Sequence, residues 1–141
     1  MATRGFISHL DLNVSDPDRS LPFYELVLGY LGFISHSIDD RRRFWSLATR
    51  NGPELAIEIR PPSHPPPRRY HERYTPGIDH LAFHAESRAA VDELARLLVE
   101  AGYEVADPPA EYGYTAGYYA VAFDDPDGIR LEVVHEPAAN P

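Results

Sequence analysis

The sequence has 141 residues, no cysteine and a formal net charge of −9, from 22 acidic and 13 basic side chains. This length suits one domain, or two small halves that share a core, and the lack of cysteine excludes disulfides and thiolate chemistry. The acidic balance argues against nucleic-acid binding, which needs a basic face to neutralise phosphates. Because the sequence has neither an apolar run of membrane length nor a secretory leader pattern, we expect a cytoplasmic protein that does not enter membranes.

The first half is predicted to contain a strand, a helix and three further strands. In chain order these are expected over residues 6–14, 17–28, 33–39, 42–49 and 54–60. Strict alternation of apolar and polar side chains marks the first strand. The Ser-Asp-Pro segment at 15–17 is a helix-start signal, and Gly29 and Gly32 mark the expected helix end. The following two strands form a hairpin that turns at residues 39–40.

The second half repeats this order after a proline-rich stretch. The prolines of residues 61–67 cannot join a regular strand ladder, so we expect a linker over 61–76 between modules over 1–60 and 77–136, with a tail over 137–141. The elements of the second module are expected over residues 78–85, 87–101, 103–106, 117–124 and 129–135. Its helix is predicted to be capped by Ser87 and ended by Gly102. Each module is thus βαβββ in the α+β class, with its helix on one sheet face and the other face free to line a trough.

The repeat places one histidine and one glutamate at matching positions of each half. His9 in Ile-Ser-His-Leu-Asp-Leu corresponds to His80 in Ile-Asp-His-Leu-Ala-Phe, and Glu58 in Leu-Ala-Ile-Glu-Ile to Glu132 in Ile-Arg-Leu-Glu-Val. Successive side chains of a strand point to opposite faces, so all four should lie on the face away from the apolar core. Two imidazoles and two carboxylates are a plausible set of ligands for one divalent cation, if the two halves pair by pseudo-twofold symmetry.

Several other side chains are candidates for contact with a small-molecule substrate. These are Asn13, His84, Tyr114, Tyr118 and Arg130. Both tyrosines belong to a glycine-hinged segment at 112–119. This segment is either a loop with surface tyrosines or a lid whose phenol donates to a substrate oxygen. His84 is either a second acid or base or an ordinary polar lining residue. Arg130 either binds a substrate carboxylate or pairs with an acid of a neighbouring strand.

Nearly the whole chain, about residues 6–135, resembles the vicinal oxygen chelate superfamily. That family includes glyoxalase I, extradiol dioxygenases, methylmalonyl-CoA epimerase, fosfomycin-resistance enzymes and bleomycin-resistance proteins. The resemblance is carried by His-Leu-Asp-Leu-Asn-Val at 9–14, Phe-Tyr-Glu-Leu-Val-Leu-Gly at 23–29, and the turn Asp-Pro-Asp-Gly at 125–128 followed by Leu-Glu at 131–132. It implies two βαβββ modules that form a curved mixed sheet around a metal-binding trough.

The ligand positions of the glyoxalase I branch fall on His9, Glu58, His80 and Glu132. This resemblance implies one divalent metal ion, either nickel, zinc, cobalt or manganese, with iron as an alternative. It also implies a lyase or isomerase that moves a proton beside a carbonyl group through a metal-stabilised enediolate, with Glu132 as base and Glu58 as second base or acid. The Arg and Asn that hold glutathione in short bacterial glyoxalases are replaced here by Asn13 and Pro62, which argues against glutathione as the thiol.

Two other functions stay open at the level of sequence. An extradiol-type dioxygenase would use His9, His80 and Glu132 as a facial triad on Fe(II), and a fourth ligand at Glu58 argues against it. A non-catalytic protein that sequesters a cationic drug, as bleomycin-resistance proteins do, suits the acidic charge, but the intact set of four ligands argues against it because those proteins lack the metal set. In each case we expect a homodimer, with the trough built within one chain or across two.

Overall fold

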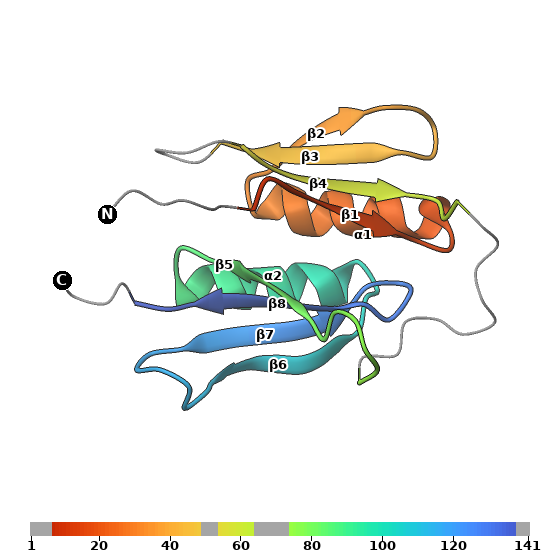
Figure 1. Ribbon diagram of the computed structural model, residues 1–141. Coiled ribbons are helices and arrows are strands. Elements are labelled where there is room, and N and C mark those ends of the chain that lie inside the picture. The colour runs from red at the N-terminus through yellow and green to blue at the C-terminus, as the bar shows by residue number, and fades with distance from the viewer. Residues whose placement is uncertain (1–6, 49–53, 64–73, 138–141) are drawn as a thin grey trace. The chain divides into compact units, whose positions relative to one another are not determined.

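The computed structural model describes residues 7–48, 54–63 and 74–137 (Figure 1). The chain divides into two compact units, residues 1–68 and 69–141. Each unit is a four-stranded mixed sheet with one helix, in the order βαβββ, so the predicted α+β class is confirmed. The predicted linker falls largely on residues 64–73, which lie outside the described part of the chain. Among the described residues, no helix is long and apolar enough to cross a membrane.

Unit 1 contains one helix and four strands. These are β1 (His9–Asn13), α1 (Pro17–Tyr30), β2 (Ile34–Ser37), β3 (Arg43–Leu47) and β4 (Leu55–Arg60). The strands lie in the order β1-β4-β3-β2, with β1 parallel to β4 and the other neighbours antiparallel. The apolar core of this unit comes from both the helix and the sheet, and includes Phe23, Tyr24, Val27, Leu28, Trp45, Ile57 and Ile59.

Helix α1 begins where the sequence predicts and ends slightly later. A carboxylate oxygen of Asp16 accepts a hydrogen bond from the backbone N–H of Asp18 at 3.1 Å, and Pro17 takes the first helical position. The helix continues through Gly29, so the prediction that this residue marks its end is wrong. Gly32 adopts the left-handed conformation with φ of 89° that terminates the helix, as predicted.

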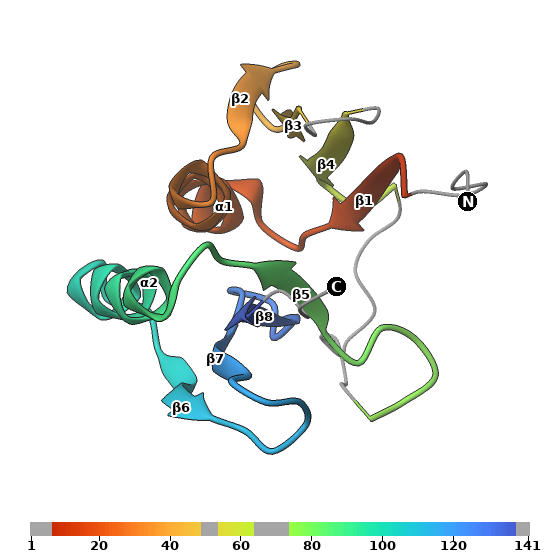
Figure 2. The same ribbon diagram turned by 90° about the vertical axis from the view of Figure 1, so that its left-hand side faces the viewer.

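Unit 2 repeats the same arrangement. Its elements are β5 (Leu81–His84), α2 (Arg88–Glu100), β6 (Val105–Glu111), β7 (Tyr119–Asp124) and β8 (Arg130–His135). The strand order is β5-β8-β7-β6, with β5 parallel to β8. Helix α2 covers one face of this sheet, as Figure 2 shows. It starts at the predicted cap, where the Ser87 hydroxyl accepts from the N–H of Ala90, and Gly102 follows its end with φ of 86°.

Strand β6 is longer than the sequence predicts. A strand was expected over 103–106, but the structure extends it to Glu111 and carries Pro108 and Pro109 within it. Because β6 is the edge strand of its sheet, a missing proline N–H can face outward without breaking a ladder bond. The pairing with β7 also shifts register twice, between Val105 and Asp107 and between Asp107 and Ala110. Such irregularity hides the alternation on which a prediction relies.

In both units, the strand that carries the predicted glutamate pairs in the same register with the strand that begins at or directly after the predicted histidine. Glu58 of β4 lies opposite Asp11 of β1, and Glu132 of β8 lies opposite Ala82 of β5. In each unit the predicted histidine stands two positions before that partner, on the same face. The neighbours of both glutamates within their strands are buried, so the predicted alternation is confirmed. The glutamates therefore lie on the sheet face that the helix does not cover, and a trough between the two open faces stays a prediction.

Candidate functional site

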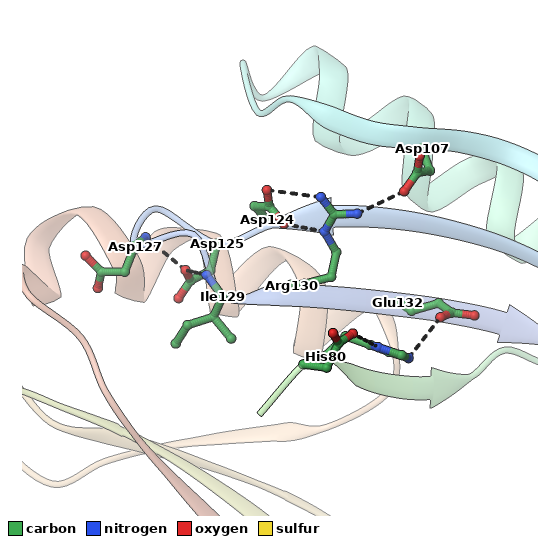
Figure 3. A network of polar contacts seen from close by, with 9 residues as sticks. His80, Asp107, Asp124, Asp125, Asp127, Ile129, Arg130 and Glu132 are labelled. Atoms are coloured by element: carbon green, nitrogen blue, oxygen red, sulfur yellow. Dashed lines mark hydrogen bonds and ion pairs between the residues drawn. The ribbon is translucent and has the colours of Figure 1, made fainter. Parts of the chain in front are cut away.

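Unit 2 brings two of the predicted ligands together on the open face of its sheet. His80 directly precedes β5, and Glu132 lies within β8, which pairs with β5. Nε2 of His80 lies 3.4 Å from Oε2 of Glu132 (Figure 3). The side chain of His80 is 39% exposed and that of Glu132 is 16% exposed, so solvent and small solutes can reach this pair.

Asp79 fixes the tautomer of His80. Its Oδ1 lies 2.7 Å from Nδ1 of His80, so Nδ1 carries a proton and donates a hydrogen bond to the carboxylate. A neutral imidazole then presents the lone pair of Nε2 toward Glu132. Two electron-rich atoms at this separation repel each other unless a proton or a cation lies between them.

The spacing of His80 and Glu132 fits a divalent cation. Two ligand atoms at about 2.1 Å from a zinc-like ion, in tetrahedral geometry, lie about 3.4 Å apart. Histidine ligands also commonly donate their other ring nitrogen to a carboxylate, which is the role that Asp79 fills here. The pair therefore suits a metal ion as well as it suits a protonated imidazole.

Tyr118 holds the other oxygen of Glu132. This tyrosine directly precedes β7, and its hydroxyl donates a hydrogen bond to Oε1 of Glu132. Burial raises the pKa of Tyr118 well above its usual value, and the hydrogen bond to Glu132 raises it further. The phenol is therefore a protonated, neutral donor at physiological pH.

A pocket of about 190 Å³ adjoins His80 and Glu132. The small side chains of β7 leave room on the open face, because Ala122 lies directly opposite Glu132. The residues that line the pocket are His80, Asp107, Tyr112, Tyr114, Ala120, Val121, Ala122, Arg130 and Glu132. An apolar cavity of about 150 Å³ is large enough for benzene. The pocket therefore admits a molecule of about one ring with a few substituents.

Arg130 is engaged by two acidic side chains of neighbouring strands. Its Nε lies 2.5 Å from Oδ1 of Asp124 on β7, and its Nη1 lies 2.9 Å from Oδ2 of Asp107 on β6 (Figure 3). The side chain is only 14% exposed. Of the two alternatives for Arg130, the structure contains the pairing with acids of neighbouring strands. With both acids ionised, this wall of the pocket carries a net negative charge.

The turn before β8 fixes the start of that strand. The carboxylate of Asp125 is buried, and its Oδ1 accepts hydrogen bonds from the backbone N–H groups of Asp127 and Ile129, each at 2.8 Å (Figure 3). Because Glu132 follows three residues after Ile129, this turn sets the point from which the candidate ligand is placed. The Asp-Pro-Asp-Gly turn thus contributes to the site through the backbone.

The tyrosine-rich segment divides between the two faces of the sheet. Tyr112 and Tyr114 stack at 6.0 Å between ring centroids, and Tyr118 meets both rings edge-on. Tyr119 instead donates from its hydroxyl to Asp92 of α2 at 2.6 Å, on the side of the helix. The exposed ring of Tyr114, 77% accessible, forms the outer wall of the pocket.

In unit 1 the matching carboxylate is neutralised by arginine. Nε and Nη2 of Arg42 donate to Oε1 of Glu58 at 3.0 Å and 2.7 Å, and Nε of Arg60 lies 3.7 Å from the same oxygen. Arg60 also pairs with Asp11 at 3.0 Å. Two guanidinium groups beside Glu58 make this carboxylate a weaker attractor of cations than Glu132, whose hydrogen-bond donor Tyr118 carries no charge.

The remaining predicted residues of the site lie on the open faces of their own units. His9 stands at the start of β1, with its Nδ1 3.2 Å from the hydroxyl of Ser8. Asn13 and His84 end β1 and β5, and both are exposed. Among the residues that the structure describes, no group of three or more His, Cys, Asp or Glu side chains could hold a metal ion. The described residues therefore bring together the pair of His80 and Glu132 in unit 2. A metal site that uses all four predicted ligands stays a prediction.

Three residues of the site were not anticipated in these roles from the sequence. Asp79 directly precedes His80, so its position beside a predicted ligand was the available signal. Arg42 belongs to a run of three arginines, and nothing in that run distinguishes the one that reaches Glu58. Asp107 lies in the part of β6 that the sequence did not predict as strand.

Comparisons with known proteins agree with the fold. The sequence profile of the Glyoxalase/Bleomycin resistance protein/Dioxygenase superfamily matches residues 6–133. The uncharacterized protein YqjT of Bacillus subtilis (strain 168) is 32% identical over 131 residues, covering 89% of this chain and 95% of the relative. A crystal structure from Bacillus halodurans, of a protein regarded as a glyoxalase, has a TM-score of 0.77 and 28% identity over 94% of this chain and 97% of that chain. A glyoxylase/bleomycin resistance protein/dioxygenase domain from Frankia sp. EAN1pec has a TM-score of 0.69 and 25% identity, over 98% and 96% of the two chains.

Proposed function

The chain belongs to the Glyoxalase/Bleomycin resistance protein/Dioxygenase superfamily, and on this basis we propose that it is a divalent-metal-dependent lyase or isomerase. In this proposal it acts on a small carbonyl compound and moves a proton on the carbon beside the carbonyl group. The observation that carries the proposal is the pair of His80 and Glu132 beside a pocket, with Asp79 behind the imidazole.

His80 and Glu132 would hold the metal in unit 2, and His9 and Glu58 would contribute from unit 1. Nickel, zinc, cobalt or manganese suits such a set of nitrogen and oxygen ligands. When bound, a divalent cation supplies Lewis-acid polarisation of the substrate oxygens. The acidic surroundings of His80 favour cation binding, because Asp79, Glu132 and the net charge of the Arg130 cluster all attract positive charge.

Glu132 is the proposed proton acceptor. It faces the pocket from the centre of β8, and Tyr118 engages its Oε1. Oε2, the oxygen beside His80, would leave the cation when substrate binds and would then accept the proton. Glu58 is the proposed second base or acid, and Arg42 holds it in an ion pair at 2.7 Å. The pocket volume suits a part of the substrate of about one ring or a chain of comparable size.

Metal analysis and isotope exchange together test this proposal. Protein purified without chelator or affinity-tag histidines should contain a stoichiometric divalent metal by elemental analysis. In D₂O it should catalyse wash-in of deuterium beside the carbonyl of at least one member of a panel of 2-hydroxyketones and thiol adducts of 2-oxoaldehydes, measured by proton NMR. Glu132→Gln should abolish the exchange. Full turnover by Glu132→Gln would show that this residue is not the base.

The ion pair between Arg42 and Glu58 favours a second candidate, an extradiol-type dioxygenase. If Glu58 stays bound to Arg42, the remaining set of His9, His80 and Glu132 is a facial triad of the kind that binds Fe(II) and keeps positions open for substrate and oxygen. Reconstitution with Fe(II) followed by oxygen-electrode measurements on a panel of catechols tests this. Oxygen consumption that depends on catechol, with no deuterium exchange, would select the dioxygenase.

The proposal includes a homodimer. Among the described residues, each sheet ends in two edge strands, β1 and β2 in unit 1 and β5 and β6 in unit 2, and such edges can pair with a second copy. Light scattering coupled to size-exclusion chromatography should give twice the chain mass of 15.9 kDa. A monomer at micromolar concentration would contradict this part of the proposal.

A further inference from the structure

The carboxylate of Glu132 has two oxygens with different surroundings. Oε1 accepts the hydrogen bond of the Tyr118 hydroxyl, whereas Oε2 lies 3.4 Å from Nε2 of His80. A carboxylate on a free side chain can rotate and exchange these oxygens. Here the Tyr118 hydroxyl holds Oε1, so Oε2 is the oxygen that faces the imidazole.

We infer that Tyr118 is a positioning residue that presents Oε2 of Glu132 as the single oxygen facing the cation site beside His80. This inference rests on the proposed metal-dependent function and adds the residue that sets the denticity of one ligand. Without the hydroxyl of Tyr118, the carboxylate is free to turn both oxygens toward the cation or to swing away from it.

The backbone around Tyr118 is built to hold this side chain in place. The N–H of Tyr118 donates to the carbonyl of Thr115 at 3.2 Å, and its carbonyl accepts from the N–H of Tyr112 at 3.0 Å. The Thr115 hydroxyl in turn donates to Glu136 at 2.9 Å, just beyond β8. Gly117 has φ of 79°, a conformation that L side chains rarely adopt. Because Tyr112 directly follows β6 and Glu136 directly follows β8, these contacts tie Tyr118 to the ends of both strands.

A comparison with unit 1 shows why a phenol matters in this position. Glu58 is also held through one oxygen, but by the guanidinium of Arg42 at 2.7 Å. A guanidinium orients a carboxylate and also cancels its charge, which weakens the attraction for a cation. Tyr118 orients Glu132 without adding a positive charge. The two units therefore carry one carboxylate held by an uncharged donor and one already paired with a guanidinium.

Titration of the protein with Co²⁺ tests this role. Glutamate and histidine ligands give bound Co²⁺ a visible absorption spectrum that depends on coordination number and geometry. Tyr118→Phe removes only the hydroxyl and should weaken Co²⁺ binding about 10- to 100-fold, the range for loss of a group that orients a metal ligand. It should also change the visible spectrum, because the denticity of Glu132 is no longer fixed. The matched control is Tyr119→Phe, which removes the hydroxyl of the next tyrosine in the sequence, bonded to Asp92 of α2 on the helix side of the sheet, and should leave both readouts unchanged.

A second variant separates positioning from packing. Tyr118→Gln keeps a hydrogen-bond donor but loses the ring, and it should retain more Co²⁺ affinity than a Tyr118→Leu variant, which keeps neither. Equal Co²⁺ affinity in the Tyr118→Phe variant and the unmodified protein, with an unchanged spectrum, would overturn the inference and leave the metal-dependent function intact. Failure of the unmodified protein to bind Co²⁺ would overturn the proposed function together with this inference.

Discussion

Replacement of Asp79 is expected to weaken metal binding without unfolding the protein. The carboxylate of Asp79 accepts a hydrogen bond from Nδ1–H of His80 at 2.7 Å and so directs the lone pair of Nε2 toward Glu132. Hydrogen bonds to charged groups contribute about 1.5–3 kcal/mol. Asp79 and His80 are 51% and 39% exposed, so solvent screens this bond and the lower end of the range applies. About 1.5–2 kcal/mol corresponds to roughly 10- to 30-fold in the metal dissociation constant.

Competition between the protein and a chromophoric chelator for Zn²⁺ or Ni²⁺ measures this effect. Asp79→Ala should show the full loss of metal affinity. Asp79→Asn should show a smaller loss of affinity, because an amide still accepts a hydrogen bond but carries no charge. The matched control is Ser8→Ala, which stands at the equivalent position before His9 in unit 1 and offers that imidazole a hydroxyl instead of a charge. A dissociation constant within twofold of the unmodified protein for Asp79→Ala would refute the reasoning, since His80 would then bind metal without its carboxylate or not at all.

Three further predictions concern the scaffold of unit 2. Phe123→Ala empties a fully buried position of β7, opposite Leu131 of β8. It should lower the free energy of unfolding by about 3–5 kcal/mol, measured by urea denaturation. Asp125→Ala leaves two backbone N–H groups of the turn without their acceptor and should cost about 1–3 kcal/mol, with unchanged stability as the contrary result. Gly117→Ala would bring a Cβ within 2.6 Å of Pro137 Cγ at a φ of 79°, so we expect more than about 1 kcal/mol of destabilisation and weaker metal binding through displacement of Tyr118. Wild-type stability of Gly117→Ala by thermal denaturation would show that the segment relaxes freely.

The sequence predicted the modules because their signals are local. Alternation along β4 and β8 placed Glu58 and Glu132 on the open faces, and the burial of their strand neighbours confirms it. The cap at Asp16 predicted the start of α1 correctly, because a cap depends on residues one turn apart. The predicted length of β6 was too short. Its two register shifts and its edge position, which tolerates prolines, both depend on how it pairs with β7, and local sequence does not report that pairing.

The sequence by itself thus determined the two βαβββ units, their apolar faces and the positions of the four predicted ligands, because periodicity and capping act over a few residues. Only the tertiary structure decided what each ligand touches. The reach of Arg42 to Glu58 across 16 residues and of Tyr118 to Glu132 across 14 depends on strand pairing and on side-chain length. Those contacts distinguish a neutralised carboxylate from one that keeps its charge, although both occupy the same place in the repeat.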